Sequence, residues 1–183
     1  MEHDHHPQLH QVIQQVHINM PWQHLPKHLD MVLEHGFHLE IGLGGKDLDV
    51  LSRNEARIMA TKLRQRGIRL SLHGPFWDLC AGSPDPLIRQ VTRLRLHQFF
   101  DMVPIFEPVQ VVCHTGYDPR HHDDWRHFLE VSLDTWEPLL ERAEMTEVPL
   151  LLENVWELGP QLHQGLFARL PSSYFGFCLD VGH

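Results

Sequence analysis

Five residues of types that commonly ligate divalent metals stand at the ends of four separate apolar segments. His73 ends LSLH, His114 ends VQVVCH and Glu153 ends PLLLE, whereas Asp180 and His183 follow FGFC. Roughly 30 to 40 residues separate one segment end from the next, about the length of one strand–helix unit. In a parallel barrel the carboxyl ends of all strands open on one face, so we expect these five side chains to converge there.

A mixed set of imidazole and carboxylate ligands suits Zn²⁺, Mn²⁺, Co²⁺ or Fe²⁺ better than Ca²⁺ or Mg²⁺, which prefer oxygen ligands. A single histidine at a strand end more often makes a structural hydrogen bond. Glu153 is harder to explain in that way, because a carboxylate in an apolar strand must be paired, protonated or bound to metal. The agreement of four strand ends therefore predicts a divalent metal site, and two carboxylates leave room for a second ion.

Three further residues are candidates for binding a substrate. Glu40 lies in an apolar segment, Trp77 follows HGPF, and Asn154 follows Glu153. Glu40 could instead orient a metal ligand, and Asn154 could orient Glu153. Each residue also has a structural alternative: a salt bridge for Glu40, packing for Trp77 and a strand-end cap for Asn154.

Apolar segments with strand character alternate with helical patterns along the whole chain. The expected strands are 15–20, 37–43, 68–73, 109–114, 149–154 and 175–180, and the expected helices are 26–35, 54–66, 85–106, 125–144 and 162–170. Within these helices, Asn54 suits the start of the second, and Leu87, Val91, Leu94 and Phe99 are expected to face inward from the third. Arg89, Arg93 and Arg95 are expected on its solvated side. Six such units in a row predict a parallel α/β fold of the TIM-barrel type.

A complete barrel of this type has about 250 residues, and this chain has 183. We therefore expect residues 15–183 to form a barrel domain that lacks its last two strand–helix units. The two open sheet edges would invite pairing with another chain, which makes a homo-oligomer one expectation. Residues 1–14 are rich in histidine and are expected to form a flexible leader.

The composition is that of an ordinary globular chain, with a formal charge of −9 from 15 basic and 24 acidic residues. This balance weighs against duplex DNA as a partner, since duplex-binding surfaces are usually basic. No apolar run approaches the roughly 20 residues of a membrane span, and no signal sequence is evident, which predicts a cytoplasmic protein. The three scattered cysteines do not suggest a disulfide framework.

The segments LHGPFWDLCAGSPDPLIRQ, VVCHTG, LLLENV and CLDVGH resemble the xylose-isomerase-like TIM barrels. That superfamily includes isomerases and epimerases of sugars and sugar phosphates, and also endonuclease IV. The resemblance implies that His73, His114 and Glu153 bind one metal together, as in the endonuclease-like members. It also implies that Asp180 is a metal ligand and that His183 binds a further metal or contacts substrate.

Three functions follow from this resemblance. The first is a divalent-metal-dependent isomerase or epimerase of a small sugar or sugar phosphate, with Glu153 as ligand and acid/base and His183 as the contact to a substrate hydroxyl. The second is an abasic-site endonuclease with DNA as its partner. The third is a catalytically degenerate barrel that binds metal without turnover.

Overall fold

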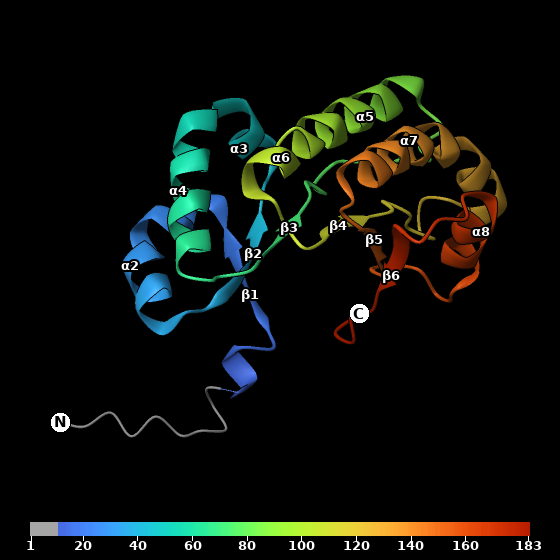
Figure 1. The fold of residues 1–183 in the computed structure, drawn as a ribbon. Helices are drawn as coiled ribbons and strands as arrows, with labels where there is room; N and C mark the ends of the chain where they lie inside the picture. Colours follow the sequence, from blue (N-terminus) through green and yellow to red (C-terminus); the bar gives the residue numbers. More distant parts are fainter. Residues whose placement is uncertain (1–10) are drawn as a thin grey trace.

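In the computed structural model, which describes residues 11–183, six parallel strands pair in chain order to form one sheet (Figure 1). The sheet belongs to the barrel type that the alternation of strands and helices predicts. The first ten residues of the expected leader lie outside the described residues. The strands are β1 (His17–Pro21), β2 (His38–Gly42), β3 (Leu70–His73), β4 (Val111–His114), β5 (Leu150–Glu153) and β6 (Phe175–Cys178).

Helices connect the strands and lie around the outer side of the curved sheet (Figure 1). None of the helices within residues 11–183 has the length and hydrophobicity needed to cross a bilayer. They are the 3₁₀ helix η1 (Trp22–His24) and the α-helices α2 (Leu25–His35), α3 (Gly45–Val50), α4 (Arg53–Gln65), α5 (Pro86–Phe100), α6 (Val103–Phe106), α7 (Trp125–Thr146) and α8 (Gln161–Arg169).

Successive side chains of each strand point to opposite faces of the sheet. Toward the helices the strands present apolar side chains, such as Leu39, Ile41 and Leu72, which are fully buried. The register pairs Asn19 with Glu40 and His114 with Glu153, so these polar residues share the inner face. Because of this alternation, one face of the sheet packs against the helices and the inner face carries the polar side chains.

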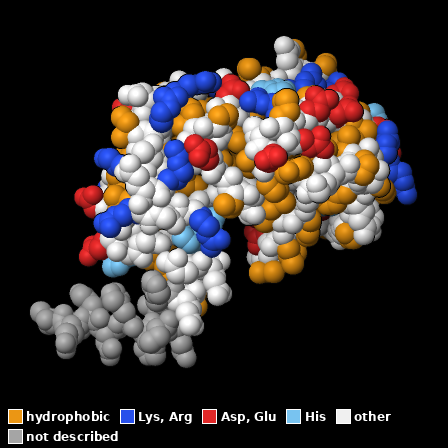
Figure 2. Space-filling model, in the orientation of Figure 1, with side chains coloured by type: hydrophobic (Ala, Val, Ile, Leu, Met, Phe, Trp, Pro, Cys, Tyr) orange, Lys and Arg blue, Asp and Glu red, His pale blue; other side chains and the backbone are white. Residues whose placement is uncertain are grey.

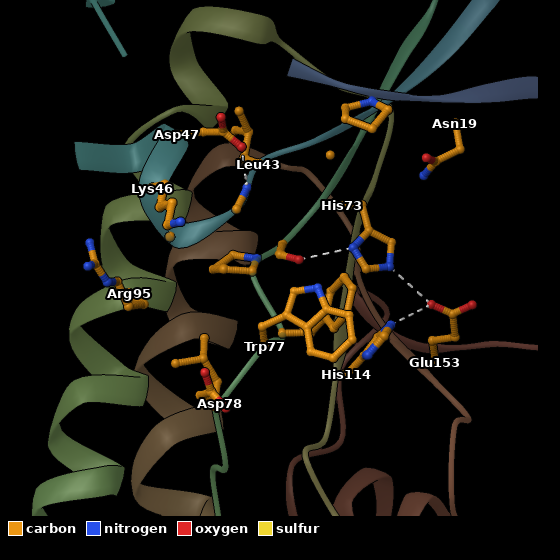
Figure 3. A pocket seen from close by; sticks show the side chains of 18 of the residues that line it. Asn19, Leu43, Lys46, Asp47, His73, Trp77, Asp78, Arg95, His114 and Glu153 are labelled. Carbon is orange, nitrogen blue, oxygen red and sulfur yellow. Dashed lines mark hydrogen bonds and ion pairs between the residues drawn. The ribbon is translucent and has the colours of Figure 1, made fainter. Parts of the chain in front are cut away.

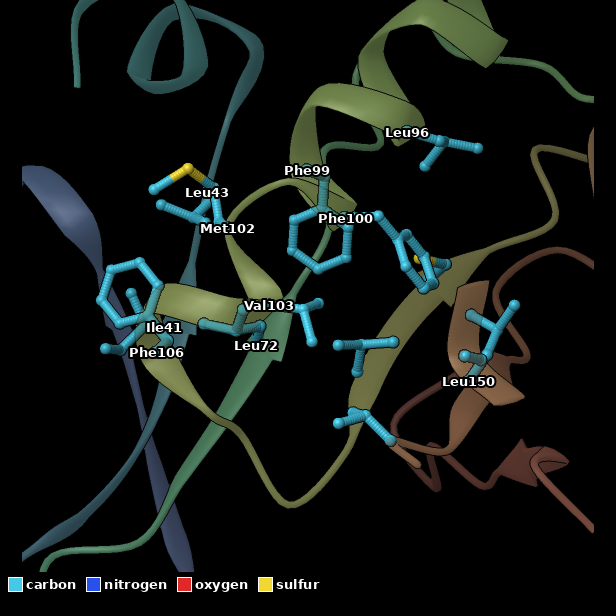
Figure 4. Packing of buried hydrophobic residues seen from close by; sticks show 14 of the residues in the cluster. Ile41, Leu43, Leu72, Leu96, Phe99, Phe100, Met102, Val103, Phe106 and Leu150 are labelled. Carbon is cyan, nitrogen blue, oxygen red and sulfur yellow. The ribbon is translucent and has the colours of Figure 1, made fainter. Parts of the chain in front are cut away.

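The hydrophobic core lies between the sheet and the helices (Figure 4). Phe99 and Phe106, from α5 and α6, are fully buried in it together with Leu72 of β3. Cys113 of β4 is also fully buried, and this burial raises the pKa of its thiol to about 12. All three cysteines are free.

The helix predicted over residues 85–106 is two helices, and the prediction of its inner face is confirmed for Phe99 but wrong for the other three residues. Leu87, Val91 and Leu94 are exposed, whereas Leu96 and Phe99 are buried. The chain leaves the first helix at Asp101 and Met102, and Pro104, which lacks an N–H, lies in the first turn of α6. Apolar residues lie on two faces of α5. The face that contains Leu96 and Phe99 is buried because α5 packs against α7.

The start of α4 differs from the prediction, because the capping residue is Ser52. Its Oγ accepts a hydrogen bond from the N–H of Glu55 at 3.3 Å, and Asn54 lies within the first turn. We expect Ser52→Ala to lower the free energy of unfolding by about 1 kcal/mol, because one N–H of the first turn loses its acceptor. Asn54→Ala is the matched control, with an expected change below about 0.5 kcal/mol. Urea denaturation of both variants measures the difference, and equal losses would contradict the assignment.

Candidate metal centre

Three predicted ligands meet at the carboxyl ends of β3, β4 and β5. The Nε2 atom of His73 lies 3.2 Å from Oε2 of Glu153, and Nε2 of His114 lies 3.0 Å from the same oxygen (Figure 3). One potential ligand atom from each of the three residues lies within 4.8 Å of the others. Two imidazoles and one carboxylate therefore point at a single small region of space, and we call His73, His114 and Glu153 the triad.

Backbone contacts fix the orientation of His73. Its Nδ1 lies 3.0 Å from the carbonyl oxygen of Gly74, which requires Nδ1 to be the donor and turns Nε2 toward Glu153. Burial acts to lower the pKa of His73, but the hydrogen bonds to Glu153 and Gly74 outweigh it and raise that pKa. A hydrogen bond from the second ring nitrogen to a carbonyl is the usual support of a metal-ligating histidine.

Glu153 lies between the two histidines and is only 15% exposed. Hydrogen bonds from His114 and His73 hold the pKa of its carboxyl group well below the usual range, although burial acts in the opposite direction. The carboxylate is thus ionised at neutral pH. An ionised carboxylate beside two imidazoles supplies the donor set that first-row divalent ions prefer, so the triad fits Zn²⁺, Mn²⁺, Co²⁺ or Fe²⁺.

Asp180 and His183 form a second pair near the triad. Asp180 lies two residues beyond the end of β6, so it follows the strand and does not belong to it. Oδ2 of Asp180 lies 3.5 Å from Nε2 of His183. Within residues 11–183, the ligand atoms that lie close enough together to hold one ion are those of the triad, and Asp180 and His183 do not belong to this group. Both residues nevertheless line the cavity that the triad faces.

Asn154 joins β5 to the segment after β6. Its amide donates to the carbonyl oxygen of Asp180 and accepts from the Asp180 N–H, each at 2.9 Å. Asn154 does not line the cavity. Its side chain therefore holds Asp180 in place, which is closer to the structural alternative than to the predicted contact with substrate.

The triad opens into a cavity of about 1080 Å³ at the carboxyl ends of the strands. Glu40 and Trp77, both predicted as substrate contacts, line it. Oε1 of Glu40 accepts a hydrogen bond from the side-chain amide of Asn19 at 3.1 Å. The space is large enough for a small-molecule substrate with several polar contacts.

The structure adds residues to the cavity wall that the sequence did not single out. The Phe76 ring stacks on His114 with centroids 4.6 Å apart. Lys46 and Asp47 lie across the cavity from the triad (Figure 3). They belong to α3, a helix that was not among those predicted from the sequence. Arg95, expected on a solvated face, also lines the cavity and pairs with Asp49. Of these residues, only Phe76 could have been suggested by the sequence, because it directly precedes Trp77, a predicted substrate contact.

The curved parallel sheet and the triad at its carboxyl end define a TIM-barrel protein with a candidate metal centre. A model of the xylose isomerase-like TIM barrel family matches residues 29–183. The chain therefore belongs to this family, as the sequence resemblance predicted. No curated protein matches the sequence.

Solved structures with the same fold cover most of this chain. The TTHB071 protein from Thermus thermophilus, soaked with ZnCl2, is 29% identical with a TM-score of 0.73, over 91% of this chain and 66% of its own. A D-tagatose 3-epimerase-like protein is 21% identical with a TM-score of 0.76, over 92% and 66%. Endonuclease IV from Thermus thermophilus is 15% identical with a TM-score of 0.60, over 91% and 62%. The chain thus spans about two thirds of the length of these structures.

Proposed function

We propose that this chain belongs to a divalent-metal-dependent isomerase or epimerase, which moves a proton next to the carbonyl group of a small sugar or sugar phosphate. The observation that carries the proposal is the triad, with two imidazole nitrogens and a carboxylate oxygen at the wall of a cavity of small-molecule size. A divalent ion held there would polarise a carbonyl group and stabilise the negative charge that develops on its oxygen. The likeness to a D-tagatose 3-epimerase-like protein supports the same reaction class.

The roles of the chain's own residues follow from their contacts. His73, His114 and Glu153 would hold the ion. The low pKa of Glu153 makes its carboxylate a weak proton acceptor, which favours the role of ligand over that of acid/base. His183 is exposed in the cavity wall and would contact a substrate hydroxyl, while Asn154 keeps Asp180 beside it.

The test is exchange of a substrate C–H proton with solvent. The protein loaded with Zn²⁺ or Mn²⁺ is incubated in D₂O with free and phosphorylated ketoses, and proton NMR follows the signals next to the carbonyl group. We expect the parent protein to catalyse this exchange. His73→Ala should lower the exchange rate by at least about 100-fold, because one metal ligand is lost. His121→Ala, at an exposed histidine outside the triad, is the matched control. Absence of exchange from a metal-loaded protein that binds the sugar would overturn the proposal and favour a catalytically degenerate barrel.

An abasic-site endonuclease is the second candidate, because both His73 and His114 contact Glu153. The resemblance assigns such a ligand set to the endonuclease-like members. The face in Figure 2 shows Lys and Arg side chains interspersed with Asp and Glu, without one continuous basic patch. Since phosphate contacts dominate DNA affinity, binding of an abasic duplex that weakens steeply with salt would favour this candidate.

A further inference from the structure

The charge on the cavity wall is mainly negative. Among the described residues that line it, two cationic side chains, Lys46 and Arg95, face five carboxylates. A divalent ion in the triad would add two positive charges and leave an excess of one negative charge. A cavity lined by one sign of charge raises the local concentration of ligands of opposite charge and disfavours ligands of the same sign. The five carboxylates are Glu40, Asp47, Asp78, Glu153 and Asp180.

Two features that could receive an anion are already engaged by the chain's own carboxylates. Arg95 pairs through both terminal nitrogens with Asp49, including 2.9 Å between Nη2 and Oδ2. The N–H of Gly44, at the start of α3, donates to Oδ2 of Asp47 at 2.8 Å. A phosphoryl group carries nearly two negative charges and is usually bound by arginine, lysine and backbone N–H groups. In the described part of the wall, Lys46 is the cation that remains outside these pairs.

The cavity also presents an aromatic shelf, formed by Phe76 and Trp77. The two rings pack with centroids 5.2 Å apart, and Phe76 in turn stacks on His114. The Trp77 side chain is 79% exposed, although it lies beside the triad (Figure 3). Asp78, the next residue, has a positive φ of 60°, a strained conformation that fixes the direction of the loop. An exposed tryptophan at this position offers an apolar face to the C–H face of a sugar ring.

Acceptors for hydroxyl groups lie in the same wall. Glu40 uses Oε1 to accept from Asn19 and makes no side-chain hydrogen bond through Oε2 within residues 11–183. The Asp180 carboxylate is about one third exposed and lies in the same cavity. Carboxylates are strong acceptors for hydroxyl donors, so both can bind a polyhydroxylated ligand.

We propose that the cavity selects an uncharged sugar over a phosphorylated one, with the aromatic shelf contacting the ring and Glu40 accepting from its hydroxyl groups. This inference rests on the proposed function, since it names the substrate class of that same site. It assigns specificity to Trp77, Glu40 and Asp78, which lie outside the triad.

The test compares matched pairs of ligands with the full-length, zinc-loaded protein. Saturation-transfer NMR and isothermal titration measure binding of D-fructose and D-tagatose and of their 6-phosphates. We expect the free sugars to bind at least tenfold more tightly than the phosphates. Trp77→Ala should weaken binding of the free sugars by about tenfold. Leu158→Ala, at an exposed apolar residue outside the cavity, should leave their binding unchanged. Asp78→Asn should improve binding of the phosphates by about fivefold, since asparagine tolerates a positive φ and removes one repulsive charge.

The outcomes separate this inference from the proposed function. Tighter binding of the phosphates, or no effect of Trp77→Ala on the free sugars, overturns the inference and leaves the isomerase proposal standing. A zinc-loaded protein that binds neither ligand of any pair also overturns the inference. Selective binding of free sugars without C–H exchange supports the inference and contradicts the proposed function instead.

Discussion

Glu153→Gln is expected to weaken Zn²⁺ binding by at least about 100-fold, because Oε2 of Glu153 is the atom on which His73 and His114 converge. Glutamine keeps the size of the side chain but removes the negative charge that the ion requires. Without that charge, the pKa of His73 should also fall, since its hydrogen bond to Glu153 raises it. Isothermal titration with ZnCl₂ gives the affinity, and elemental analysis gives the metal content.

Four N-terminal histidines, His3, His5, His6 and His10, must be replaced by glutamine in every sample, because they can bind metal on their own. His121→Gln is the matched control, and its affinity should equal that of the parent chain. An affinity that Glu153→Gln leaves unchanged would show that the triad does not hold the ion. Loss of affinity in both variants would indicate an effect on the fold.

Gly116→Ala is expected to lower the free energy of unfolding by about 2–5 kcal/mol. Gly116 has a φ of 75°, which costs a residue with a Cβ about 1–2 kcal/mol. In addition, that Cβ would lie 2.6 Å from the carbonyl oxygen of Leu79 and 2.9 Å from Cα of Cys80. Backbone atoms cannot move aside as a side-chain end can, so overpacking adds a further cost of about 1–3 kcal/mol.

Gly67→Ala is the matched control for this prediction. Gly67 has nearly the same φ, 72°, and its Cβ would meet no atom within 4 Å. Gly67→Ala should therefore lower the free energy of unfolding only by the cost of the left-handed backbone conformation, about 1–2 kcal/mol. Urea denaturation followed by circular dichroism measures both variants, and equal losses would contradict the predicted clash. Because Gly116 lies two residues after His114, its variant should also bind Zn²⁺ less tightly.

The sequence by itself determined the strands, their order and the face to which each side chain points. The backbone of a strand turns successive side chains to opposite faces, so the phase of an apolar run fixes the direction of its last residue. For this reason His73, His114 and Glu153 could be placed on one face before their contacts were known. The fully buried Cys113, which points toward the helices beside His114, follows from the same alternation.

Only the tertiary structure decided which of the predicted residues meet, and which surface of each helix is buried. Glu153 contacts both histidines, whereas Asp180 and His183 form a pair of their own, because the path of the chain after β6 is set by the hydrogen bonds of Asn154. The buried stripe of α5 and the place of Arg95 in the cavity wall likewise depend on neighbouring elements, α7 and α3. Local periodicity is a property of the backbone and can be read along the chain, but these choices are made by contacts between residues far apart in sequence.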